Sequence, residues 1–293
     1  MPNTLVHFGI QTLASKVVFR PADVKWIGLA CLIPDLPWIT QRLIHPLTIV
    51  DPIDLRLYVI IQSTLFFSLI LAAGISLQVK NSGKIFLLLG FNCLFHLLLD
   101  PTQIKWANGS HLLAPFSWQL INFNCYWPEQ FPSLLLTMTG LVIFPIFAWH
   151  DRHRKMVFFM DRKRQTVGFL LIAIYFLLPL LLFNGPLQAN NHFSATLNNS
   201  TDRKGAYIEI DRSSYLAKKR TIEAITNEQL KLEGKLPENN CTLSVQGKFT
   251  NNNTILVSKY HVHSPMRDIY STSGIIMLLA SWLVALLSKR INS

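Results

Sequence analysis

Long apolar runs separated by short polar segments are the main pattern along this chain. Residues 57–79 form 23 consecutive uncharged positions. At about 1.5 Å per residue, one helix of that length crosses a hydrocarbon core of about 30 Å. Four further runs predict membrane-spanning helices: 85–99, 133–149, 166–183 and 269–288. The pattern therefore predicts five spanning helices.

Two shorter apolar segments precede these runs, at 4–19 and 24–33, and they end at Arg20-Pro21 and Pro34 respectively. Each is short for a full span, so we expect helices that pack against the longer ones. The N-terminus lacks the basic region, single apolar region and small-residue cleavage site of a secretory signal. We therefore expect no segment to be removed.

Residues 185–268 have a different composition, rich in Asn, Lys, Glu and Thr. Alternation predicts a strand at 207–211, and a hairpin of 241–249 with 254–262 around three asparagines. Residues 214–226 are expected to form a helix. The predicted fold is thus an all-α integral membrane helical bundle with a small α+β water-exposed domain inserted before the last transmembrane helix. The expected boundaries are 1–184 for the bundle, 185–268 for the domain and 269–293 for the last helix.

Composition supports a membrane protein, because 50% of the residues are hydrophobic and only 15% are charged. Soluble domains have roughly a quarter of charged residues. These proportions exclude disordered, collagenous and coiled-coil proteins. The net charge of +11 lies in short loops beside the apolar runs, which indicates membrane orientation and argues against a nucleic-acid partner.

The basic loop between 149 and 166 orients the chain by the positive-inside rule. Its cations are Arg152, Arg154, Lys155, Arg162, Lys163 and Arg164. The pairs Lys80 with Lys84 and Lys289 with Arg290 fall on the same side. We expect a multi-pass protein of the inner or cell membrane in which 104–132 and 185–268 lie outside the cytoplasm.

His96 and Asp100 are the first candidates for chemistry, because ionisable groups in apolar helices are costly. Four positions apart on a helix, their side chains share a face and can bind one metal ion. Pro101 ends the helix, and Thr102 can donate a hydrogen bond there. A plain His–Asp hydrogen bond at a helix end explains the pair equally well.

His7 and Asp35 lie in similar settings, on the first helix and after the second. The expected topology brings them to the outer ends of their helices, together with His96 and Asp100. An interfacial histidine and a turn residue between prolines are the alternatives.

The order of His7, Pro34-Asp35 and His96-Leu-Leu-Leu-Asp100-Pro-Thr102, followed by Gly109 and Leu113-Ala-Pro-Phe-Ser117, resembles the membrane-bound metal-dependent hydrolases of the YdjM type. That family is considered related to the phospholipase C and P1 nuclease group, which hydrolyses phosphoesters with zinc. The resemblance covers roughly 4–117. It implies that His7, Asp35, His96 and Asp100 bind a divalent metal, for which zinc is expected.

The leading hypothesis is a hydrolase acting on a phospholipid or another phosphoester at the outer membrane face, with Asp35 or Asp100 as the catalytic proton acceptor. Two positions differ from the family: Pro37 replaces an Asp, and Gln62 replaces a His. They motivate a competing hypothesis, a non-catalytic membrane protein with a degenerate metal site and a partner-binding outer domain. A transporter is the third, although no paired broken helices are predicted.

Other residues have weaker patterns. His45 and His111 lie in expected outer loops, where they either complete the site or are solvated. His261 and His263 share a strand face and can hold a metal or simply face solvent. A Cys125–Cys241 disulfide can tether the outer loop to the outer domain. The two remaining cysteines, Cys31 and Cys93, are expected to be packing residues.

Overall fold

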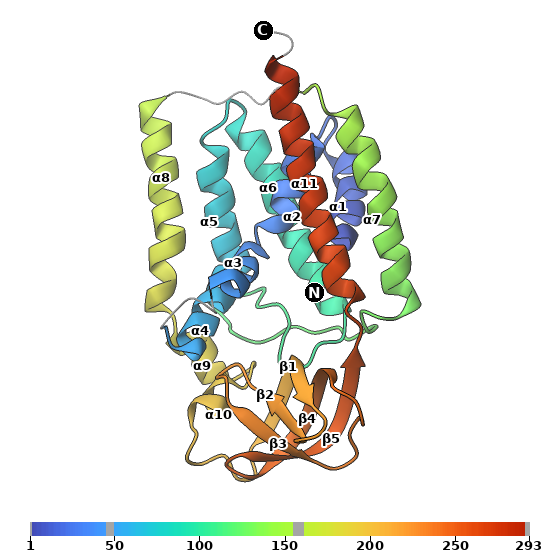
Figure 1. Ribbon diagram of the computed structural model, residues 1–293. Helices are drawn as coiled ribbons and strands as arrows, with labels where there is room; N and C mark the ends of the chain where they lie inside the picture. The colour runs from blue at the N-terminus through green and yellow to red at the C-terminus, as the bar shows by residue number, and fades with distance from the viewer. Residues whose placement is uncertain (1, 45–49, 155–160, 291–293) are drawn as a thin grey trace.

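The computed structural model describes residues 2–44, 50–154 and 161–290, which form a helical part above a five-stranded barrel (Figure 1). The longer helices are α1 (Thr4–Val18), α2 (Val24–Leu32), α3 (Leu36–Ile44), α4 (Pro52–Gln62), α5 (Leu65–Ser76), α6 (Ser82–Leu99), α7 (Phe131–His150), α8 (Arg162–Leu177) and α11 (Met266–Arg290). A short helical turn, η2 (Asp100–Thr102), follows α6. A second one, η3 (Leu178–Leu181), follows α8 and precedes the short helices α9 (Asn184–Ala189) and α10 (Ser194–Asn198).

The barrel closes in the order β1, β2, β3, β5, β4. Its strands are β1 (Tyr207–Leu216), β2 (Thr221–Glu223), β3 (Gln229–Glu233), β4 (Cys241–Asn251) and β5 (Thr254–His263). All neighbours pair antiparallel except β3 with β5, which pair in parallel. The predicted strand at 207–211 and the predicted β4–β5 hairpin are confirmed.

The predicted all-α class is wrong, because the closed barrel makes the chain a mixed α/β protein. The expected helix at 214–226 is instead the end of β1, a turn and β2. Tyr215 pairs with Ile222 across these strands, and both side chains are buried in the barrel. Burial against the other strands outweighs the local helical pattern, since strand preference depends strongly on tertiary context.

The predicted set of five spanning helices is also corrected. Within the described residues, three helices are long and apolar enough to cross a membrane: 82–102, 131–150 and 162–181. The run 57–79 is not one helix, because α4 and α5 meet at a bend of 66°. Ser63 Oγ donates to Val59 O at 2.8 Å and Thr64 Oγ1 donates to Ile61 O at 2.9 Å, so these hydroxyls end α4.

Helices α1 and α7 approach unusually closely. A Cβ atom on Gly140 of α7 would lie 1.7 Å from the carbonyl oxygen of Leu5 on α1, and one on Gly9 would lie 2.6 Å from the Gly140 Cα. Only glycine fits at this crossing, which is the close packing by small residues that membrane helices use.

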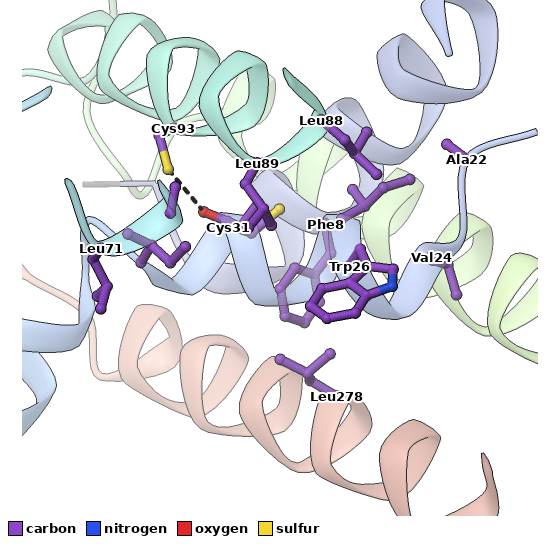
Figure 2. Close-up of a cluster of buried hydrophobic side chains, with 14 of the residues drawn as sticks. Phe8, Ala22, Val24, Trp26, Cys31, Leu71, Leu88, Leu89, Cys93 and Leu278 are labelled. Atoms are coloured by element: carbon purple, nitrogen blue, oxygen red, sulfur yellow. Dashed lines mark hydrogen bonds between the residues drawn. The ribbon is translucent and has the colours of Figure 1, made fainter. Parts of the chain in front are cut away.

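One apolar cluster of the helical part takes buried side chains from α1, α2, α4, α5, α6, α7, α8 and α11, and Figure 2 shows part of it. Phe8 of α1 and Trp26 of α2 lie beside Leu278 of α11, and side chains of the other helices complete the cluster. Cys93 donates its thiol to Ala30 O at 3.9 Å. Cys31 and Cys93 are buried and free, which confirms them as packing residues.

The barrel has its own apolar core, but the core also includes Ile53 and Leu57 of α4. Both side chains are nearly inaccessible to solvent. Because α4 continues into α5 through the bend, this contact fixes the barrel to the helical part. This contact therefore also fixes the position of the segments that connect the barrel with the helices.

Candidate metal centre

Two histidines from distant parts of the chain meet inside the helical part. His7 lies in the second turn of α1 and His96 in the last turn of α6, and both are completely buried. Their imidazole rings stack with centroids 3.8 Å apart and planes 7° from parallel. The parallel rings therefore present two nitrogens on one side.

Two carboxylates face these nitrogens. The Asp100 carboxylate reaches both rings, with Oδ1 3.3 Å from His7 Nε2 and Oδ2 3.7 Å from His96 Nε2. Asp35 Oδ1 lies 3.5 Å from His96 Nε2. Asp35 is held there because its carbonyl accepts the Ile39 amide at the start of α3. The structure thus brings together all four residues that the sequence singled out.

The facing atoms lack hydrogen bonds although they are buried. His7 Nε2, His96 Nε2, Asp35 Oδ1 and Asp100 Oδ1 have none within the described chain. Buried polar atoms without partners are rare and costly, so each calls for an explanation. Four ligands around zinc at about 2.0–2.1 Å are separated by roughly 3.3 Å. The observed separations and donor types fit a divalent metal ion of that kind.

Three of the residues form the tightest group. One ligand atom from each of His7, His96 and Asp100 lies within 4.8 Å of the others. Asp35 is outside this group, and its side chain is 12% exposed towards a cavity of about 220 Å³. Three protein ligands with an open fourth position are typical of catalytic zinc sites.

Gln11, one turn after His7 on α1, orients the first ring. Its amide nitrogen lies 3.2 Å from His7 Nδ1, and its amide oxygen accepts the Cys31 thiol at 3.0 Å. Turning the amide by 180° would place its oxygen at His7 Nδ1–H and its NH2 group at the Cys31 sulfur, and this orientation would leave the His7 Nε2 lone pair free for a metal. Partners of this kind set the tautomer of metal-binding histidines.

A second group, Glu129 with His261 and His263, has metal-binding residue types but a different environment. Both histidines contact Glu129 at 3.1 Å, and His263 Nε2 lies 2.8 Å from Ser244 Oγ. None of these side-chain atoms is a buried atom without a partner, and Arg212 lies 3.8 Å from Glu129. We interpret the group as a hydrogen-bonded joint between the loop after η2 and β5.

Glu129 was not predicted as a functional residue, because it lies in a polar loop where no regular spacing of metal-binding residue types marks it. The stacked ring of Trp127 on His261, at a centroid distance of 3.7 Å, completes the joint. Burial raises the pKa of Glu129, but the hydrogen bonds from His261 and His263 outweigh it and hold that pKa below its ordinary value. The carboxylate form therefore stabilises the fold.

The Glu129 joint predicts a pH-dependent loss of stability. A lowered folded-state pKa contributes stability that is present above the ordinary pKa of 4.5 and is lost as the pH falls below it. Glu129→Gln should cost about 1–2 kcal/mol at pH 7. Thermal unfolding from pH 7 to pH 3 should show a shallower decline for Glu129→Gln than for wild type. The exposed Glu233→Gln serves as control, and parallel wild-type and Glu129→Gln curves would contradict the prediction.

Other predicted residues lie outside the centre. His45 is outside the described residues. His111 is buried and contacts His192 at 2.9 Å, and burial lowers the pKa of His111 to about 4. Gln62 donates to Tyr175 O at 3.2 Å, away from the four residues.

The predicted Cys125–Cys241 disulfide is wrong, because both cysteines are free. Cys125 is exposed in the loop after η2, where its thiol points towards Phe123 O at 3.9 Å. Cys241 begins β4 and is half-buried. The polar Glu129 joint, not a disulfide, connects this loop to the barrel.

Comparison with family models, with curated proteins and with solved structures found no match. The function is therefore argued from the residues themselves and from the resemblance noted in the sequence.

Proposed function

We propose that this protein is a membrane-bound metal-dependent hydrolase that acts on a phosphoester or phospholipid-like substrate at the outer membrane face. The observation that carries the proposal is the set of buried, unpartnered ligand atoms on His7, His96, Asp35 and Asp100. The resemblance to the YdjM-type family, which rests on these same residues, supplies the substrate class.

Exposed apolar side chains support a membrane location. Large apolar residues are exposed along α7, α8 and α11, among them Leu135, Val142, Phe169, Leu177 and Leu279. In water such a surface would be a large unfavourable patch, whereas lipid covers it at no cost. The Arg152 guanidinium lies over the exposed Trp149 ring at 4.1 Å, an arrangement suited to a membrane–water interface.

The arrangement of charges supports the orientation. The end of α7, the start of α8 and the C-terminal end of α11 lie at the end of the helical part opposite the barrel (Figure 1). There Asp151 is buried and binds Lys16 Nζ at 2.5 Å and Arg154 Nε at 3.0 Å. With this basic end in the cytoplasm, the barrel and the metal centre lie towards the outside.

The residues divide into ligands and a base. His7, His96 and Asp100 would hold the metal, and zinc suits two imidazoles and a carboxylate. A zinc ion bound there supplies Lewis acidity, which lowers the pKa of a water towards about 7 and polarises the phosphoester. Asp35 borders the open cavity and accepts the proton, because Asp100 is already shared between two histidines.

Activity measurements on the detergent-purified protein test the proposal. Wild type should hydrolyse a generic phosphodiester or phospholipid with zinc, manganese or magnesium. Asp35→Asn should keep its metal and lower kcat about 10²- to 10⁴-fold, the usual contribution of a general base. Asp202→Asn, an exposed change of the same kind, should have no effect. Wild type without bound metal and without metal-dependent turnover would overturn the proposal.

The competing function is a non-catalytic membrane protein. It is favoured by Gln62, which occupies the place of a family histidine and hydrogen-bonds to Tyr58 and Tyr175 instead of joining the centre. Metal binding without turnover on any phosphoester would favour this reading. In that case the metal would stabilise the fold, and the barrel would bind a partner.

A further inference from the structure

A cavity of about 400 Å³ lies between the helical part and the barrel. Its walls come from α3, α4, the loop after η2, β1 and the start of α11. Five cationic side chains line it, against two carboxylates: Arg42, Arg56, Lys105, Arg212 and Arg267 against Glu209 and Asp211. We call it the basic cavity. Its volume is in the range of small-molecule sites.

Lys105 is buried and Arg56 is half-buried, and neither has an anionic partner among the described residues. Lys105 is 6% exposed, and among the described residues no carboxylate forms an ion pair with Lys105 or Arg56. Arg56 Nε is buried and has no hydrogen bond, while the guanidinium stacks on Trp38 at 4.5 Å. A buried charge without an ion pair destabilises the folded protein, so its presence indicates that a bound group or another interaction offsets this loss.

The carboxylates of the cavity hydrogen-bond to other groups. Glu209 accepts the Ala107 amide at 2.6 Å and the Gln246 side chain at 2.7 Å. Asp211 accepts Ser244 Oγ at 2.9 Å. Asp268 lies 3.3–3.9 Å from the guanidinium groups of Arg42, Arg212 and Arg267, and Glu129 lies 3.8 Å from Arg212, so these three cations are partly neutralised. The positive charge without an ion pair is therefore that of Lys105 and Arg56.

The remaining potential acts on Lys105. Burial and the neighbouring Arg267 and Arg212 lower the pKa of Lys105 well below its ordinary value, and Asp211 offsets only part of this. A bound anion would raise the pKa of Lys105 again and accept hydrogen bonds from its ammonium group. The cavity therefore has an electrostatic requirement that the described residues do not meet.

The basic cavity also adjoins the metal centre. Trp38, Arg42 and Arg267 line both the basic cavity and the cavity that Asp35 borders. Trp38 additionally borders the small space beside Asp100. A ligand in the basic cavity would therefore lie next to the proposed ligands and base.

We propose that the basic cavity binds a phosphate-type group with at least two negative charges, of the phosphomonoester or pyrophosphate class, and holds it beside the metal centre. Four of the five cations are arginines, whose planar forks match phosphate oxygens in pairs. The group belongs either to a lipid headgroup or to a soluble phosphate compound. Its role as part of the substrate rests on the proposed hydrolase, whereas its binding does not.

Pyrophosphate binding to the full chain in detergent tests the cavity. The titration is made in the His96→Ala background, so that pyrophosphate does not act by removing metal. Lys105→Met should weaken binding about 10- to 100-fold, as expected for a lost charge-assisted contact. Without pyrophosphate, the same substitution should raise Tm, because it replaces a buried polar amine that has no ion pair by an apolar side chain. Lys248→Met, an exposed change on β4, should alter neither.

A second arm identifies the source of the phosphate group. Discs containing phosphatidate should stabilise the protein more than discs of phosphatidylcholine if the ligand is a lipid headgroup, and Lys105→Met should abolish the difference. A response to pyrophosphate alone supports a soluble ligand. The cavity proposal is overturned if the His96→Ala protein binds no pyrophosphate and wild type gains no stability from phosphatidate, or if adding Lys105→Met leaves both responses unchanged. Anion binding by a wild type that holds no metal would keep the cavity and reject its link to hydrolysis.

Discussion

Detergent-purified His96→Ala protein is expected to retain less than about one-tenth of the wild-type metal. His96 Nε2 faces both carboxylates of the centre, so its removal takes away one ligand and leaves Asp35 and Asp100 without the group between them. Even residues that only support metal ligands cost 10- to 100-fold in affinity when changed, and a ligand should cost at least as much. Elemental analysis after dialysis measures the content, and activity should fall in parallel.

Two further variants make this result specific. Asp100→Asn keeps the size and polarity of the side chain, so equal membrane insertion with lost metal would support ligation by the carboxylate. His153→Ala changes an exposed histidine at the opposite end of the helical part and should keep its metal. Equal metal content in wild type, His96→Ala and Asp100→Asn would remove the basis for the centre.

Gly140→Ala is expected to destabilise the protein by about 3 kcal/mol or more. The new methyl group would lie 1.7 Å from the Leu5 carbonyl oxygen, and backbone cannot move aside as a flexible side chain can. Inserted atoms in tight packing typically cost 1–3 kcal/mol, and this contact is closer than most. Because Leu5 precedes His7 by two residues, the displaced α1 should also weaken metal binding.

Thermal unfolding in detergent and metal content measure both effects of Gly140→Ala. Gly83→Ala is the matched control, because a Cβ at Gly83 of α6 meets no atom within 4 Å. That variant should be as stable as wild type or slightly more so, since alanine favours helices. An unchanged Tm for Gly140→Ala would mean that α1 and α7 can separate without loss.

The helices were predictable because their signal is local. Charged and proline residues delimit α1, α2, α6 and α7, and their predicted limits lie within three residues of the observed ones. The bend between α4 and α5 was not predicted, because Ser63 and Thr64 are uncharged and do not interrupt an apolar run. Their effect depends on which carbonyls their hydroxyls reach, and hydropathy carries no such information.

The barrel could be predicted only in part, because its closure depends on contacts between distant segments. Leu230 and Leu232 alternate with exposed polar residues throughout β3, so a strand signal was present but only five residues long. The β3–β5 pairing that closes the barrel is parallel, and it joins segments whose register no short pattern specifies.

For the candidate centre, the residue types and the i, i+4 spacing identified His96 and Asp100, the similar settings and the expected topology added His7 and Asp35, and the resemblance implied that all four bind metal. Neither source could indicate the basic cavity, because its cations come from five separate segments of the chain. Charges that are isolated in the sequence become a site only when the fold places them around one space.

The position of Ile53 and Leu57 affects how the protein can be divided. These side chains complete the barrel core from a point in the chain about 130 residues before α9, so a fragment beginning near residue 185 would lack them. Its apolar interior would then be open on the side that α4 normally covers, which favours aggregation. A stable barrel therefore requires α4, and a separately produced barrel would need polar residues at the positions that Ile53 and Leu57 cover, or the α4 segment added as a peptide.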